Sequence, residues 1–265
     1  MTEILISLIT MGGLGLLFSI GLILAYKKLR VEEDPLVAKI EEFLPGVNCG
    51  ACGYSGCWAY AEAVASGQSE ANKCSVGGEE VIKRISDLLG IEIGQTVKKT
   101  GRIHCQGSLA SAKFKGNYRG INSCYAAHLI GGNKLCQYGC LWLGDCVRVC
   151  PFDAIYLDRD GLPVIIEEKC LACGKCVEAC PRGIIEILPN YQKVIIFCRN
   201  QNKGAIARKL CKNACLACGI CARACPEAIA IENYLALIVN PDRITPDCQP
   251  KLEKCPTKAI RVINK

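Results

Sequence analysis

The residues in this chain best suited to chemistry are four cysteines in a run that ends in a proline. Cys170, Cys173, Cys176 and Cys180 have the spacing C-x2-C-x2-C-x3-C, and Pro181 follows. In bacterial ferredoxins this spacing places three thiolates on one [4Fe–4S] cluster and sends the fourth to a second cluster. The proline fixes its own φ and has no N–H, which helps the chain to leave the loop. The run predicts an iron–sulfur site with a partner run; the alternative, a zinc ribbon, uses separated cysteine pairs.

A Cys-Pro pair followed by a short apolar segment recurs through the C-terminal half, at intervals of 30, 45 and 30 residues. The cysteines of these pairs are Cys150, Cys180, Cys225 and Cys255. Two pairs with the same internal spacing predict two tandem two-cluster modules. Each half-module should contain a cysteine loop, a short helix that ends at Cys-Pro, and a strand, for example over 154–157 or 184–188. Few residues remain for an apolar core, so cluster ligation should supply much of the folding free energy.

The opening run of the first module departs from the ferredoxin spacing, because Leu143 stands where the middle cysteine is expected. Cys136 is near enough in sequence to supply the missing thiolate. We therefore expect two sets of ligands in this module. One set is Cys136, Cys140, Cys146 and Cys180, and the other is Cys150, Cys170, Cys173 and Cys176.

The second module opens with an intact run, but its partner run is eroded. Aligned on Cys255, the expected cysteine positions hold Thr245, Cys248 and Lys251. One complete set remains, namely Cys215, Cys218, Cys221 and Cys255. Cys225 has lost its usual partners. A fourth ferredoxin-type site rebuilt from spare thiols is one interpretation, and structural thiols are the other; the residues concerned are Cys198, Cys211, Cys225 and Cys248.

A separate group of cysteines lies near the N-terminus, at intervals of x2, x4 and x16. Its members are Cys49, Cys52, Cys57 and Cys74. Glycines between them let backbone N–H groups approach sulfur, and such hydrogen bonds tune the potential of a cluster. The spacing predicts a self-contained four-cysteine cluster, with a structural zinc site as the alternative.

The elements that must position these groups begin with an apolar helix. Residues 4–26 carry no charge, and at 1.5 Å per residue this stretch is roughly 34 Å long, enough to span a bilayer. Lys27, Lys28 and Arg30 follow it and Glu3 precedes it, so the positive-inside rule places the rest of the chain in the cytoplasm. A cleaved signal peptide would need basic residues before the apolar run and a small-residue cleavage site after it, and neither is present. We expect a single-pass anchor in the cytoplasmic membrane.

Further elements follow the anchor. Asp34 and Pro35 predict a helix start, and the pattern over 79–89 predicts an amphipathic helix that ends at Gly90. Among residues 91–135, Cys105 and Cys124 are either buried thiols or have a cluster or packing role, and His104 and His128 are expected to be satisfied polar side chains. The sequence predicts five divisions. An anchor covers 1–30, a four-cysteine cluster domain covers 31–90, and a linker region of uncertain structure covers 91–135. Two ferredoxin-like modules cover 136–195 and 196–265, and the second is partly degenerate. The expected fold class is α+β.

Composition narrows the functional classes. The chain has 265 residues, 22 cysteines and a formal charge of +7. It is too long for a small secreted disulfide scaffold, so the cysteine spacing indicates metal binding. The basic balance suits acidic partners or an anionic membrane surface, and the scattered Lys and Arg give no nucleic-acid patch. No strand-flanked G-x-G-x-x-G and no G-x-x-x-x-G-K-[ST] occurs, so flavin and NAD are expected on other proteins of a complex.

Nearly the whole chain resembles the B subunit of the Rnf complex, an ion-translocating ferredoxin:NAD oxidoreductase of bacterial membranes. The resemblance rests on the uncharged helix, NCGACGYSGC with Cys74, YGCLWLGDCVRVCPFDAI and CLACGKCVEACP. It implies an anchored electron-transfer subunit that takes electrons from reduced ferredoxin and relays them to other subunits, without a catalytic residue of its own. It also implies that the 49–74 group binds a membrane-proximal cluster. Thr245 and Lys251 depart from a complete repeat, so four [4Fe–4S] clusters are expected, or five if the last site is rebuilt.

Two other functions fit parts of the pattern. The chain would suit a different membrane oxidoreductase, such as a hydrogenase or a molybdoenzyme, although the 49–74 group argues against this. A zinc-stabilised interaction protein is the second alternative, and colour distinguishes it, because iron–sulfur proteins are brown.

Overall fold

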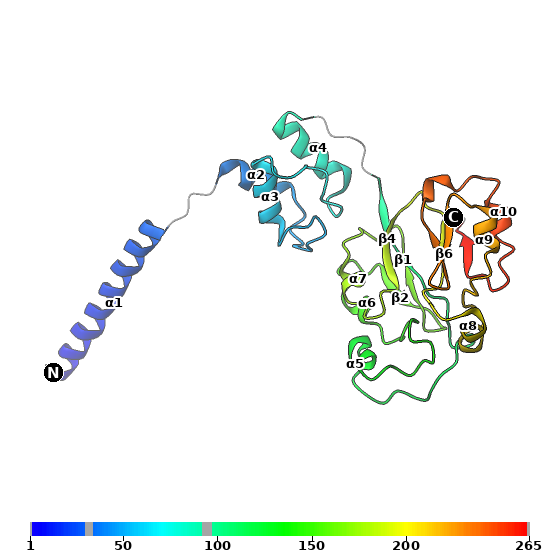
Figure 1. Cartoon of the computed structure of the whole chain (residues 1–265). Coiled ribbons are helices and arrows are strands. Elements are labelled where there is room, and N and C mark those ends of the chain that lie inside the picture. Colours follow the sequence, from blue (N-terminus) through cyan, green and yellow to red (C-terminus); the bar gives the residue numbers. More distant parts are fainter. Residues whose placement is uncertain (1, 30–33, 92–96, 264–265) are drawn as a thin grey trace.

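Figure 1 shows the computed structural model of the chain, which describes residues 2–29, 34–91 and 97–263. The chain begins with one long helix, α1 (Thr2–Leu29). Its segment Ile4–Leu29 has a mean hydropathy of 2.2 and no buried residue, and no other helix in the described ranges is long and apolar enough to cross a membrane. The helix predicted over 4–26 is therefore present, and length and composition suit it to a bilayer.

Three short helices follow, and they pack on one another around a small apolar core. These are α2 (Pro35–Phe43), α3 (Cys57–Ala65) and α4 (Gly78–Leu89). The side chain of Asp34 caps α2 by accepting a hydrogen bond from Leu36 N at 2.8 Å, as its position before Pro35 predicted. Gly90 ends α4 in the left-handed conformation, also as predicted. The core consists chiefly of Val37, Ile40, Tyr60, Val64 and Ile85.

The first ferredoxin-like module contains two antiparallel pairs of strands. The longer pair joins β1 (Lys99–Ile103) to β4 (Ile185–Pro189), with Gly101 opposite Ile187. The shorter pair joins β2 (Ile155–Leu157) to β3 (Pro163–Ile165). Short helices α6 (Asp145–Arg148) and α7 (Lys175–Glu178) precede the two Cys-Pro pairs. The strands predicted over 154–157 and 184–188 correspond to β2 and β4.

Part of the region expected to be a linker belongs to this module. The strand β1 lies in it, and so does α5 (Cys124–Leu129), which begins at a cysteine. Arg102 in β1 forms a largely buried ion pair with Glu167, which ties the strand to the loop after β3. The partner of β1 lies more than eighty residues further along the sequence, so local sequence patterns could not reveal the pairing.

The second module repeats the plan. Its strand pairs are β5 (Val194–Ile196) with β8 (Ile260–Val262), and β6 (Ile229–Glu232) with β7 (Leu235–Ile238). Its helical elements are α8 (Gly204–Leu210), α9 (Ile220–Ala224), the 3₁₀ turn η1 (Pro241–Arg243) and α10 (Gln249–Leu252). Helices α9 and α10 again precede Cys-Pro pairs, as the repeat predicted. In Figure 1 this module forms the orange and red part of the chain beside the green and yellow first module.

The cysteine loops share one backbone conformation. Ala172 in the first module and Ala217 in the second have φ of 55° and 53°, and the glycine two residues after each is also left-handed. Trp142 has the equivalent position and a φ of 63°. L-residues other than glycine rarely adopt this region, so its recurrence indicates a loop held by its surroundings. The loop at Leu143 therefore keeps the ferredoxin shape although its middle cysteine is absent.

Candidate functional site

The N-terminal group forms a cavity of about 320 Å³ lined by all four of its cysteines, Cys49, Cys52, Cys57 and Cys74. Asn48 closes the loop, because its Oδ1 accepts a hydrogen bond from Cys57 N at 2.7 Å. Gly77 N donates to Cys74 Sγ at 3.4 Å. The hydroxyl of Tyr60 donates to Glu70 O and accepts from Lys73 N, which holds the segment before Cys74 against α3. Burial raises the pKa of Tyr60 to about 12, so it stays a neutral donor.

The second group surrounds the intact ferredoxin-type run over 170–181, and its members are Cys150, Cys170, Cys173 and Cys176. Burial raises the pKa of Cys176 to about 12, and the thiols of Cys170 and Cys173 add to the shift. Cys150 lies close enough to contribute as well, although it belongs to the preceding run. Backbone amides approach two of the sulfurs, because Gly101 N donates to Cys170 Sγ and Ala154 N donates to Cys150 Sγ, each at 3.4 Å. The structure thus brings together the set expected from the sequence.

The third group differs from the expected one. A cavity of about 370 Å³ is lined by Cys124, Cys140, Cys146 and Cys180, and Cys136 is not among its residues. Burial raises the pKa of Cys146 to about 12, and Cys124 and Cys180 are the thiols that add most to it. The structure thus does not bring Cys136 into this group, which the sequence had predicted, and brings Cys124 there instead.

Two side chains explain how Cys124 reaches this group. Ser123 caps α5, and its hydroxyl donates to Asp145 Oδ2 at 3.0 Å. Tyr125 N donates to the same oxygen at 3.1 Å. Burial acts to raise the pKa of Asp145, but hydrogen bonds from Cys124 and Tyr125 outweigh it, so the pKa of this carboxyl lies below its usual range. The carboxylate therefore fixes the start of α5 beside the loop that holds Cys140 and Cys146.

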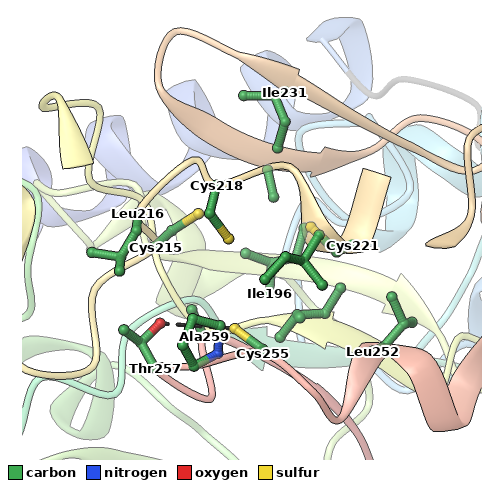
Figure 2. Close-up of a pocket in the computed structure, with 14 residues that line it drawn as sticks. Ile196, Cys215, Leu216, Cys218, Cys221, Ile231, Leu252, Cys255, Thr257 and Ala259 are labelled. Atoms are coloured by element: carbon green, nitrogen blue, oxygen red, sulfur yellow. Dashed lines mark hydrogen bonds between the residues drawn. The ribbon is translucent and has the colours of Figure 1, made fainter. Parts of the chain in front are cut away.

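The fourth group lies in the second module and matches the expected set. Figure 2 shows the four sulfurs of this group around one space. The cavity measures about 420 Å³ and is lined by Cys215, Cys218, Cys221 and Cys255 together with apolar side chains such as Ile196 and Leu252. Cys218 is the exposed member of the group. The edge of this site is thus open to solvent, while its base is apolar.

The remaining cysteines do not form the rebuilt ferredoxin-type site around Cys225. Cys225 is paired with Cys248, and their Cα atoms are 5.7 Å apart. Cys198 and Cys211 lie elsewhere, in a cavity that also contains Cys105 and Cys136. Of the two interpretations left open by the sequence, the structure thus does not bring Cys198 and Cys211 together with Cys225.

The geometry of these groups suits clusters better than single ions. In the described ranges no three His, Cys, Asp or Glu side chains come close enough together to hold one metal ion. A tetrahedral zinc ion would draw four sulfurs to about 2.3 Å from a single centre. A cubane instead offers each cysteine a separate iron atom and leaves the sulfurs further apart. Apolar cavities lined by four thiols, with N–H groups donated to sulfur, therefore fit [4Fe–4S] clusters.

The groups also lie next to one another. Burial is the main cause of the raised pKa of Cys173, and Cys49 of the N-terminal group is the thiol that adds most to it. Cys146 of the third group likewise adds to the raised pKa of Cys176 in the second. The N-terminal group thus adjoins the second, and the second adjoins the third.

Comparison with protein families assigns three segments of the chain to iron–sulfur domains. The family described as "Putative Fe-S cluster" matches residues 44–76. Two families, each described as a 4Fe-4S dicluster domain, match residues 135–185 and 169–230. The expected class of an apolar helix, an Fe–S domain and ferredoxin-type dicluster domains in a mixed α+β fold is confirmed, and the chain binds several iron–sulfur clusters.

Three curated proteins that match nearly the whole chain are B subunits of ion-translocating oxidoreductase complexes. The chain is 43% identical over 98% of its length to the B subunit of the Na⁺-translocating ferredoxin:NAD⁺ oxidoreductase complex of Acetobacterium woodii, of which it covers 78%. It is also 43% identical, over 99% of its length, to the B subunit of the proton-translocating ferredoxin:NAD⁺ oxidoreductase complex of Clostridium ljungdahlii, of which it covers 94%. The B subunit of an ion-translocating oxidoreductase complex of Methanosarcina acetivorans is 36% identical and is covered completely. The two relatives at equal identity are named for different ions, so overall identity to these proteins does not distinguish Na⁺ from H⁺.

Proposed function

Because this chain belongs to the family of B subunits of ion-translocating ferredoxin:NAD oxidoreductase complexes, the Rnf complexes, we propose that it accepts electrons from reduced ferredoxin at its second module and delivers them toward the membrane. The chain is the iron–sulfur electron-transfer subunit of such a complex.

Four sets of cysteines are proposed to hold one [4Fe–4S] cluster each. The sets are Cys49, Cys52, Cys57, Cys74; Cys150, Cys170, Cys173, Cys176; Cys124, Cys140, Cys146, Cys180; and Cys215, Cys218, Cys221, Cys255. Each cluster supplies a site for one electron, at a potential set by charge, by hydrogen bonds to sulfur and by exposure. Three of these sets follow the sequence expectation, and the fourth replaces Cys136 by Cys124. Because burial raises the pKa of thiols such as Cys146 and Cys176, iron binding should release protons.

The observation that carries the proposal is the distribution of charge. Residues 196–265 contain twelve Lys and Arg against five Asp and Glu, whereas residues 1–195 are balanced, so the second module carries the entire formal excess of +7. A basic surface steers an acidic partner by long-range attraction. The exposed Cys218 lies in the same module, and Arg223 is exposed and donates to Cys218 O at 3.4 Å. Basic surface and open cluster edge therefore coincide in the module furthest in sequence from α1.

The opposite end of the series is suited to the membrane. Cys49 of the N-terminal group follows α1 by only twenty residues, and Cys49 is also the residue that approaches the first module. Lys27 and Lys28 in the last turn of α1 favour a cytoplasmic position for everything that follows. We infer that the chain is a single-pass protein of the cytoplasmic membrane and that the other proteins of the complex receive its electrons.

Stopped-flow reduction of the anaerobically purified full chain by reduced ferredoxin tests this direction. The rate should fall steeply as ionic strength rises, and Arg223→Glu should lower it by about tenfold at low salt. The matched control is Arg159→Glu, a reversal at an exposed residue of the first module. Equal rates for the two variants, or a rate that ignores salt, would place the docking site elsewhere.

A further inference from the structure

Four cysteines outside the sets above converge on a site of their own. Cys105, Cys136, Cys198 and Cys211 line one cavity of about 350 Å³. Three of the proposed cluster sets line pockets of a similar kind, each with four cysteines. Cys136, Cys198 and Cys211 are buried, and Cys105 is half-buried.

The two modules contribute equivalent halves of this site. Cys105 follows the end of β1 by two residues, and Cys198 follows the end of β5 by two residues. The sequence K-L-C-x3-C occurs at 134–140 and again at 209–215. Its first cysteine is Cys136 in one module and Cys211 in the other. The two modules therefore contribute cysteines from equivalent positions of the repeat to this site.

A short segment of backbone ties the two halves together. Lys113 N donates to Leu210 O at 2.9 Å, and Leu135 N donates to Lys113 O at 2.9 Å. The backbone of Lys113 is thus hydrogen-bonded to the leucine of both K-L-C sequences, which is the residue before the cysteine. Gly107 lies against the site as well, because a Cβ there would be 3.5 Å from Cys211 Sγ and 3.2 Å from Lys134 Nζ.

The electrostatics of the site suit a buried negative charge. Lys134 is 1% exposed, and its Nζ donates to Gly107 O at 2.6 Å and to Cys140 O at 3.1 Å. No carboxylate among the described residues forms an ion pair with Lys134. A buried ammonium is costly without a compensating charge, and a cluster held by four thiolates carries a net negative charge.

Four hydrogen bonds also point at the sulfurs. Asn200 donates twice, through Nδ2 to Cys136 Sγ and through its backbone N to Cys198 Sγ, each at 3.4 Å. Cys140 N donates to Cys105 Sγ at 3.4 Å, and Cys215 N donates to Cys198 Sγ at 3.2 Å. Donors of this kind stabilise sulfur that carries negative charge.

We propose that Cys105, Cys136, Cys198 and Cys211 bind a fifth [4Fe–4S] cluster at the junction between the two modules. Cys140 N and Cys215 N both donate hydrogen bonds to sulfurs of this site. Cys140 belongs to a set of the first module, and Cys215 belongs to the set of the second. The junction site therefore lies between those two sets. In the proposed relay, this cluster connects the two modules, so that the second module reduces the first through it. That role rests on the proposed relay, but the presence of the cluster does not rest on it.

Iron, acid-labile sulfide and zinc per chain, measured on the anaerobically purified full chain, test the site. We expect about twenty iron and twenty sulfide, the content of five cubanes, rather than about sixteen. The double variant Cys198→Ser/Cys211→Ser should lose about four of each. The matched control is Cys225→Ser/Cys248→Ser, which changes two buried cysteines of the same module and should lose none.

Several outcomes would overturn the proposal. About sixteen iron in the wild-type chain, one zinc per chain that disappears in the Cys198→Ser/Cys211→Ser variant, or unchanged iron in that variant would each do so. If the variant does not fold, a cryo-EM map of the wild-type protein decides, since density of cubane size must lie among the four sulfurs. A wild-type chain with about twenty iron that reduced ferredoxin cannot reduce would keep the site and reject the relay.

Discussion

The first ferredoxin-like module brings together two sets of four cysteines within one frame of strands, whereas the second module brings together one set in the same frame. The difference lies in the last half-module, where Thr245 and Lys251 replace two loop cysteines. Helix α10 nevertheless forms, with its last residue Leu252 buried and its N-cap residue Cys248 packed against Cys225. Apolar packing can therefore maintain a half-module of this fold after its cluster ligands are lost.

A second difference concerns how each module completes its opening set. The second module has Cys218 in the middle of its loop, and Ile220 follows two residues later. The first module has Leu143 and Asp145 at the equivalent positions. Asp145 compensates for the missing loop cysteine, because its carboxylate holds Cys124 beside Cys140 and Cys146. In the proposed sets, one module thus takes its fourth cysteine from the loop and the other takes it from the start of a helix distant in the sequence.

A complete difference in cluster content is expected between two residues that are equivalent in the repeat. Cys150 and Cys225 each begin the Cys-Pro pair that should cross to another cluster. Cys150→Ser should remove about four iron and four sulfide per chain, because it breaks a complete set. Cys225→Ser should remove none, because Cys225 pairs with Cys248 and belongs to none of the four-cysteine groups in the described ranges. Iron and sulfide analysis of both variants makes the comparison, and equal losses would show that the second module retains a crossing cluster.

The next prediction tests the ligand exchange in the first module. Cys124→Ser should remove about four iron, and so should Cys146→Ser, but the double variant should lose the same four because both residues serve one cluster. The combination of Cys124→Ser with Cys136→Ser should lose about eight, since these cysteines belong to different cavities. If the double variant of Cys124 and Cys146 instead lost about eight iron, the two residues would serve different clusters, and Cys136 would belong to the set that the sequence suggested.

These ligand sets show where local sequence carried enough information and where it did not. The approach of Cys150, Cys180 and Cys255 to the cysteines of another run, the helix caps at Asp34 and Gly90 and the strands after the Cys-Pro pairs follow from short-range spacing. The same spacing predicted a crossing for Cys225 that the structure does not show. The role of Cys124 depends on hydrogen bonds between segments more than twenty residues apart. No spacing rule covers such a contact, because the loop between them is irregular.

One signal in the sequence could have corrected the placement of Cys136. The K-L-C-x3-C repeat makes Cys136 equivalent to Cys211. Cys211 has no place in the complete set of the second module, so Cys136 should have none in the corresponding set of the first. The same repeat points to a site shared by both modules. Cys105 and Cys198 join it only because β1 pairs with β4 and β5 pairs with β8, which tertiary structure alone reveals.

A smaller effect is expected from the residue that distinguishes the two opening loops. Asp145→Ala removes the acceptor for Ser123 and Tyr125, which should destabilise the start of α5 by about 2 kcal/mol. That corresponds to a rise of about thirtyfold in the population of the opened loop. Iron release from the chain to a ferrous chelator should accelerate, and the loss should stop at about four iron. The equivalent Ile220→Ala is the control, and acceleration of the same size there would contradict a specific role for the carboxylate.

The smallest effect concerns the junction between the modules, where the side chain of Asn200 in the second module donates to Cys136 Sγ of the first. Asn200→Ala removes this donor but leaves the backbone N–H that approaches Cys198. A hydrogen bond to sulfur stabilises the more negative, reduced state of a cluster, so its loss should lower one reduction potential while the iron content stays constant. Redox titration monitored by EPR measures the shift. Asn213→Ala is the matched control, because the Asn213 side chain donates to Gln106 O rather than to a sulfur. If both variants leave every potential unchanged, the Asn200 side chain donates to no cluster ligand, and if both shift it equally, the effect comes from packing at the junction and not from the hydrogen bond.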